Sequence, residues 1–97
     1  MPLRKPGVAP FQREFTRQMD NLIYHTEGLE KMQSMPEANG EKIQAAAKRV
    51  ATLREEIHLF VRLREPGRYA QTLRSKVLQR AARAVIRAQS LSKTGSA

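Results

Sequence analysis

The feature that most constrains the fold is a run of apolar residues spaced alternately three and four apart. This spacing places apolar side chains on one narrow stripe of an α-helix. The stripe is shielded from water when it packs against other helices. It therefore predicts a helix over residues 41–64. The residues that carry the pattern are Ile43, Ala46, Val50, Leu53, Ile57 and Phe60.

The same helical period occurs in the segments on either side. The two patterns predict helices over residues 11–35 and 68–92. No segment alternates apolar and polar residues as a half-buried strand would, so we expect an all-α fold. The earlier stripe consists of Phe11, Phe15, Met19, Leu22, Thr26 and Leu29, and the later one of Leu73, Val77, Ala81, Ala84, Ala88 and Leu91.

Turn signals separate the three predicted helices. Pro36 is followed by Asn39-Gly40 in the first gap, and Pro66-Gly67 fills the second. Short turns between long helices favour antiparallel neighbours. The sequence therefore predicts an antiparallel three-helix bundle, formed by a single domain over residues 11–92.

The two ends of the chain have a different composition. Residues 1–10 contain three prolines and a glycine, which predicts an extended, flexible arm. Residues 93–97 are polar and small, which predicts a disordered tail.

Three large apolar residues lie off the predicted stripes. Leu59 and Leu63 project roughly opposite Ile57 and Phe60, at about 100° per residue. The simpler interpretation is that this end of the helix lies between the other two helices; the alternative is the seam of a homodimer. Tyr24 projects opposite the first stripe, so it is either an incidental exposed side chain or an anchor for a protein partner.

Composition argues against several classes of site. The chain has no cysteine, which excludes disulfides and thiolate metal sites. His25 and His58 lack metal-binding spacing and are predicted to be ordinary surface or helix-edge residues. Glu55 and Glu56 are adjacent, so their carboxylates diverge on a helix. There is no glycine-rich phosphate loop, and we expect a protein without catalytic activity, metal or cofactor.

The apolar runs are short. None approaches the roughly 20 residues of a membrane-spanning helix, and the N-terminal segment lacks the apolar region of a signal peptide. We therefore expect a cytoplasmic protein without a membrane partner.

Positive charge concentrates in the final third of the chain. The formal net charge is +9, and the seven bases after Glu65 are accompanied by no acid. On the predicted third helix Arg80, Arg83 and Arg87 fall within about 40° of Lys76, and these four bases form a basic ridge. Arg74 and Lys93 flank it. Since no acid on this helix relieves the repulsion, the pattern indicates an external anion.

Two functional hypotheses follow from this ridge. The first is a small accessory protein that binds the phosphate backbone of DNA or RNA. It would lack strong sequence specificity, because no set of base-reading Asn or Gln side chains opens the helix. Arg4 and Lys5 could add a second contact. The alternative is a protein-interaction module, an adaptor or inhibitor, that docks an acidic protein through the ridge together with Leu59 and Leu63. A solvated basic surface without a specific partner is the third possibility.

Overall fold

The computed structural model describes the backbone of residues 8–35 and 40–95, and the side chains of residues 10–35 and 40–90. Its elements are α1 (Val8–Ser34), α2 (Gly40–Arg64), the 3-10 turn η1 (Pro66–Arg68), α3 (Tyr69–Leu73) and α4 (Lys76–Gly95). The described residues contain no strand, which confirms the prediction of an all-α fold.

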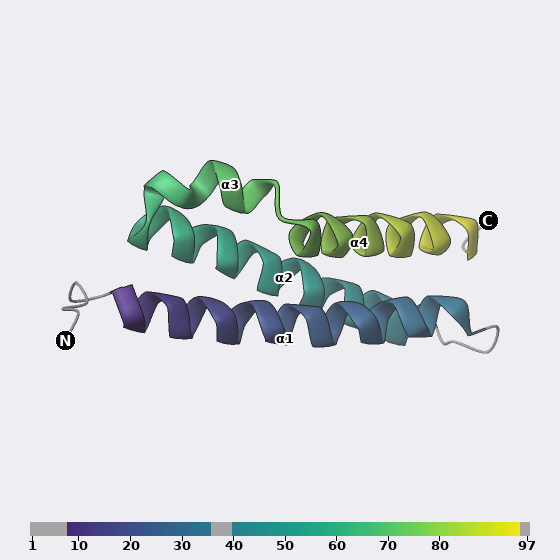
Figure 1. The fold of residues 1–97 in the computed structure, drawn as a ribbon. Helices are drawn as coiled ribbons and strands as arrows, with labels where there is room; N and C mark the ends of the chain where they lie inside the picture. Colours follow the sequence, from purple (N-terminus) through teal and green to yellow (C-terminus); the bar gives the residue numbers. More distant parts are fainter. Residues whose placement is uncertain (1–7, 36–39, 96–97) are drawn as a thin grey trace.

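The long helices form an elongated antiparallel bundle (Figure 1). α1 and α2 lie side by side in opposite directions, and α4 runs back along the half of α2 where that helix begins. α4 contacts both α1 and α2, whereas η1 and α3 pack on the far end of α2. This arrangement confirms the predicted helical bundle.

The third segment is not one continuous helix, so the prediction over 68–92 is wrong in this respect. The Arg74 N–H donates to the Gln71 carbonyl at 3.1 Å and the Ser75 N–H to the Thr72 carbonyl at 2.9 Å, which ends α3 in a tight turn. The Ser75 carbonyl then accepts from the Gln79 N–H at 3.0 Å, so Ser75 stands at the N-cap of α4.

The corner between α2 and η1 lies where the Pro-Gly pair predicts it. The Glu65 N–H donates to the Val61 carbonyl at 2.8 Å, and the Arg68 N–H donates to the Glu65 carbonyl at 2.9 Å. Pro66 opens η1 at a position where a missing N–H costs no helical hydrogen bond.

The outer helix ends differ from the predicted ones. α1 begins at Val8, inside the predicted arm, and Pro10 falls in its first turn, where the N–H groups have no helical partner. α4 ends at Gly95, so the backbone of residues 93–95 is helical rather than part of a tail. The turn predicted at residues 36–39 lies outside the described residues.

One apolar core runs between the three long helices. The stripes predicted for α1 and α2 face it, and α4 contributes mostly alanine. Phe11 closes one end, stacked on Phe60 with ring centroids 5.2 Å apart. The buried apolar residues are Phe11, Leu22, Leu29, Ile43, Ala47, Val50, Ile57, Val61, Leu78, Ala81, Ala84 and Ala88.

Candidate nucleic-acid interface

The alanines of α4 let neighbouring side chains reach its backbone. Gln33 of α1 donates to the Ala84 carbonyl at 2.8 Å, and Gln44 of α2 donates to the Ala88 carbonyl at 2.8 Å. Arg54 of α2 adds a 3.2 Å hydrogen bond to the Leu78 carbonyl. α4 is therefore held against both other helices along its buried edge.

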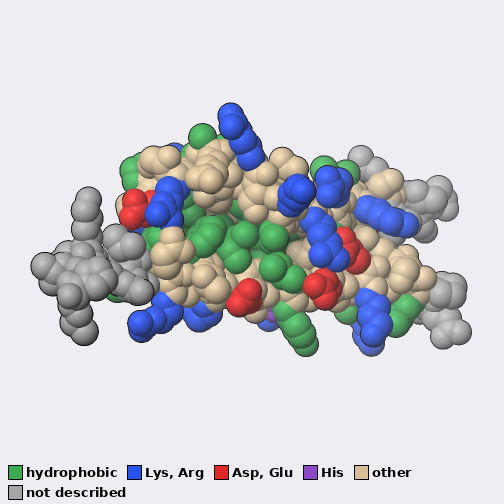
Figure 2. Space-filling view, in the orientation of Figure 1, with side chains coloured by type: hydrophobic (Ala, Val, Ile, Leu, Met, Phe, Trp, Pro, Cys, Tyr) green, Lys and Arg blue, Asp and Glu red, His purple; other side chains and the backbone are tan. Residues whose placement is uncertain are grey.

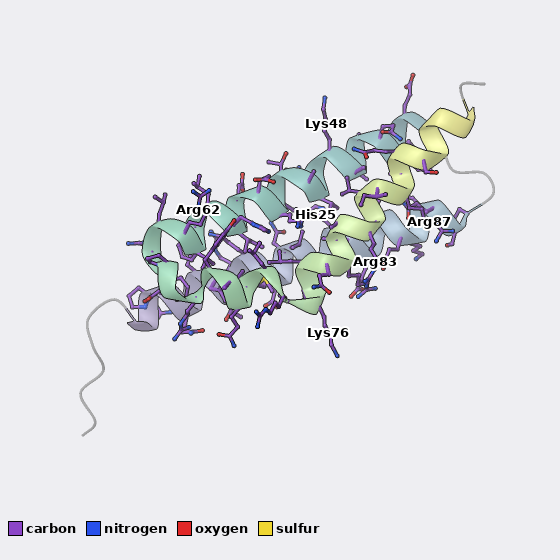
Figure 3. The ribbon with its side chains drawn as sticks, turned by 90° about the horizontal axis from the view of Figure 1, so that it is seen from above. His25, Lys48, Arg62, Lys76, Arg83 and Arg87 are labelled. Carbon is purple, nitrogen blue, oxygen red and sulfur yellow. The ribbon has the colours of Figure 1, made fainter. Side chains whose placement is uncertain are left out.

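The basic ridge lies on the side of α4 that adjoins this buried edge, about 120° around the helix from it. Lys76, Arg80, Arg83 and Arg87 are all exposed, as the helical phase predicts. Figure 3 shows Lys76, Arg83 and Arg87 projecting from the same side of α4, away from Lys48 on α2. The structure thus brings the four ridge residues onto one surface.

Arg80 differs from the other ridge residues because it has an acidic partner. Its Nε lies 3.0 Å from both carboxylate oxygens of Glu30 on α1, and one terminal nitrogen lies 2.5 Å from Oε1. This contact raises the pKa of Arg80, and Glu27 contributes to the rise. The expectation that no acid relieves the ridge is therefore wrong at Arg80. In Figure 2 blue side chains over α4 meet red ones where α4 faces α1.

The other three ridge residues lack such a partner. Among the side chains that the structure describes, none of Lys76, Arg83 and Arg87 forms an ion pair with an acid. All three are exposed on α4, and this helix packs against α1 and α2. This group of three exposed cations is the best candidate for contact with an anion.

Among the bases predicted to accompany the ridge, Arg74 is the one whose side chain the structure describes. Arg74 belongs to the turn between α3 and α4 and lines an open groove of about 470 Å³ between α1 and that turn. Phe15, Met19 and Arg68 also line this groove. Arg4 and Lys5, and the side chain of Lys93, lie outside the described residues.

The three predicted interface residues are all exposed. Tyr24 is 73% exposed on α1, where its ring lies edge-on to His25 with centroids 5.3 Å apart. Leu59 and Leu63 are 55% and 73% exposed. The end of α2 does lie between α1 and the η1–α3 segment, but these neighbours cover its other sides, so burial of the two leucines is not observed.

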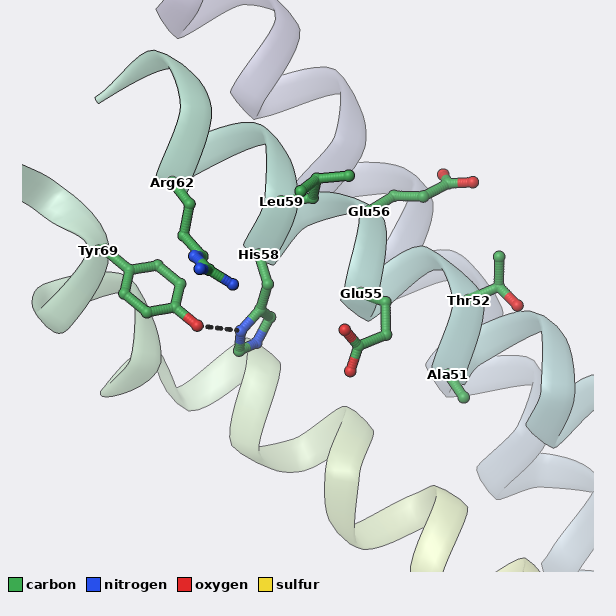
Figure 4. Close-up of a pocket in the computed structure, with 8 residues that line it drawn as sticks. All are labelled: Ala51, Thr52, Glu55, Glu56, His58, Leu59, Arg62 and Tyr69. Atoms are coloured by element: carbon green, nitrogen blue, oxygen red, sulfur yellow. Dashed lines mark hydrogen bonds between the residues drawn. The ribbon is translucent and has the colours of Figure 1, made fainter. Parts of the chain in front are cut away.

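His58 is buried, so its prediction as a surface or helix-edge residue is wrong. It is 8% exposed, and its Nδ1 lies 3.4 Å from the Tyr69 hydroxyl (Figure 4). Burial lowers its pKa, and the Arg54 cation lowers it further, against a smaller opposing effect of Glu55. No sequence signal indicated this contact, because Tyr69 reaches His58 only through the corner at η1.

An open pocket of about 510 Å³ lies beside this pair. Figure 4 shows the residues that line it. Glu55 and Arg62 lie at its edge, and the Arg62 guanidinium stands 5.5 Å from the centre of the Tyr69 ring. Within the described ranges, no three His, Asp or Glu side chains group as metal ligands would. Nor does any described helix have the length and apolarity needed to cross a bilayer.

Comparison of the chain with protein-family models, with curated proteins and with solved structures finds no match.

Proposed function

We propose that this protein is a small non-enzymatic accessory factor that binds the phosphate backbone of a nucleic acid through α4. The observation that carries the proposal is the set of exposed cations Lys76, Arg83 and Arg87 on one side of α4, none of which forms an ion pair with a described acidic side chain. From Lys76 to Arg87 the helix rises about 16 Å, a length over which duplex DNA presents roughly nine phosphates. The ridge therefore matches a run of phosphates rather than one anion.

The composition of this surface supports backbone binding without strong sequence preference. Each phosphate that a cation neutralises releases a counterion, which gives affinity whatever the base sequence. Base reading would require amide side chains aimed into a groove. α4 has two exposed amide side chains, Gln79 and Gln89, and of these two Gln79 lies near the start of the helix.

The experiment is a fluorescence-anisotropy titration of generic duplex DNA, single-stranded DNA and RNA at several salt concentrations. The proposal predicts binding whose logarithm falls linearly with the logarithm of salt concentration, with similar affinity for scrambled sequences. Absence of binding to all three probes at low salt would contradict it.

A second candidate function is docking of an acidic protein segment. The groove between α1 and the α3–α4 turn favours it, because Phe15 and Met19 give an apolar floor while Arg68 and Arg74 are exposed at its edge. An acidic helix with apolar residues on one face would complement both properties. Binding of a synthetic acidic amphipathic peptide, lost in the Arg68→Glu, Arg74→Glu double variant, would support this candidate; equal binding by that variant would exclude the groove.

A further inference from the structure

The outer face of α2 near its end carries an apolar surface that the nucleic-acid proposal does not use. Leu59 and Leu63 are one helical turn apart on this face, and both are more than half exposed. Leu59 also lines the open pocket beside Tyr69. Adjacent exposed leucines beside a hollow indicate contact with a protein surface, since phosphates gain nothing from apolar groups.

Leu59 lies between an acidic and a basic residue of the same helix. Glu55 comes four residues before Leu59 and Arg62 three residues after it. At about 100° per residue, both lie on the same flank of Leu59, within about 60° of it. A negative and a positive charge therefore stand at nearly equal distances on either side of an exposed leucine. Such a surface is complementary to a second copy of itself turned end for end.

We propose that two copies of this chain pair through α2, antiparallel, about a two-fold axis at Leu59. Leu59 of each copy then meets Leu59 of the other, and Glu55 of each copy faces Arg62 of the other on the same flank. The paired charges differ by only about 1.5 Å along the helix axis, the rise of one residue. Leu63 packs against the aliphatic part of Glu56 of the other copy.

A contact within the chain keeps Arg62 at the position that the pairing requires. The ring of Tyr69 lies 5.5 Å from the Arg62 guanidinium, so Arg62 stays beside the pocket that Glu55 also lines (Figure 4). Glu55 and Glu56 disfavour an acidic partner here. Arg62 projects on the side of the molecule away from Lys76 and Arg83 (Figure 3), so pairing leaves both basic ridges exposed.

The test is the oligomeric state of the purified chain, measured by sedimentation equilibrium without nucleic acid, from micromolar to millimolar concentration. We expect a reversible dimer in the weak range, because the face is small. Glu55→Arg and Arg62→Glu each place like charges opposite one another and should weaken dimerisation by about tenfold or more. The double variant restores opposite charges and should recover most of the wild-type affinity.

Two controls make the result specific. Asp20→Arg changes charge as Glu55→Arg does, but on an exposed part of α1, and should leave dimerisation unchanged apart from added repulsion. Circular dichroism of every variant checks that the helices remain. A wild-type chain that stays monomeric at millimolar concentration would overturn the proposal, as would a double variant no better than the single ones. Because no nucleic acid is present, neither result bears on the function proposed for α4.

Discussion

Arg80 and Arg83 lie within one turn of each other on α4, yet only Arg80 is paired with a carboxylate. The partner, Glu30, is 50 residues away in the sequence, so no local spacing indicates the pair. Helical phase alone predicts which bases share a face, but the acids that a neighbouring helix brings to that face follow from the packing. The sequence therefore predicts which bases form the ridge, but it does not predict that Arg80 is paired with an acid.

The pairing makes the ridge residues unequal in binding. Arg83→Ala should lower the salt dependence of nucleic-acid binding by about one unit of logarithmic slope. Arg80→Ala should lower it by less, because Glu30 already compensates that charge. Glu30→Gln should raise affinity, since it releases Arg80, and should raise it more than Glu27→Gln, which removes the same charge without breaking a hydrogen bond to Arg80. Anisotropy titrations at several salt concentrations measure all four, and equal slopes for the Arg80 and Arg83 variants would count against the interpretation.

Thr26 is a polar residue in the core without an observed hydrogen bond. It is 1% exposed, and its buried hydroxyl has no partner among the described residues. Thr26→Val keeps the shape and removes the uncompensated hydroxyl, so it should stabilise the fold by about 1 kcal/mol. Thr72→Val is the matched control, because the Thr72 hydroxyl donates to the Arg68 carbonyl at 2.8 Å.

Urea unfolding followed by circular dichroism gives the two free energies of unfolding. Thr72→Val loses a hydrogen bond and should destabilise the fold by about 0.5–1.5 kcal/mol. The two substitutions are chemically identical, so the same sign of change for both would show that the hydroxyl environments do not decide the outcome.

At the scale of elements, the sequence predicts the long helices well and the third segment less well. The apolar stripes of α1 and α2 are long, so their period defines clearly which face of each helix is buried. The break at Arg74 and Ser75 is local. A serine before Lys76 is a typical N-cap residue and could have indicated it. Leu73, which the predicted stripe includes, lies before the break and is 42% exposed, whereas Leu78, which the stripe omits, is 1% exposed.

The corner formed by α2, η1 and α3 contains a buried histidine, and its burial makes the free energy of unfolding depend on pH. Unfolding exposes His58 and returns its pKa to about 6.5, whereas burial keeps it lower in the folded protein. Below about pH 6.5 the unfolded chain therefore binds more protons than the folded one, and the free energy of unfolding falls as pH falls. This loss stops once folded His58 is itself protonated.

His58→Gln should remove this contribution to the pH dependence. Urea unfolding of the wild type and the variant, compared from about pH 7 down to about pH 5, isolates His58 because every other titrating group is common to both. Tyr69→Phe is a second variant that keeps the histidine, and its pH dependence should persist. Parallel curves for the wild type and His58→Gln would contradict this account.

In the whole molecule the distribution of charge is well defined, whereas the function is a proposal. The seven bases after Glu65 are accompanied by no acid in the sequence. The bundle exposes four of them, Lys76, Arg80, Arg83 and Arg87, along α4, while the alanine edge of this helix packs inward. The sequence predicts this separation from period and composition. It also offers the exposed face at Leu59 and Leu63 as one of two alternatives. It does not predict the groove at Arg68 and Arg74, because that groove depends on where η1 and α3 fold back against α2.

The most direct test of the central claim reverses the three unpaired ridge residues. We predict that the Lys76→Glu, Arg83→Glu, Arg87→Glu variant loses salt-sensitive binding to duplex DNA, single-stranded DNA and RNA. The control is Lys42→Glu, Lys48→Glu, Arg49→Glu, which makes the same change in net charge at exposed positions of α2. It should keep most of the binding. If both variants lose affinity equally, net charge rather than the α4 surface is responsible; if the ridge variant binds as the wild type does, α4 is not the interface.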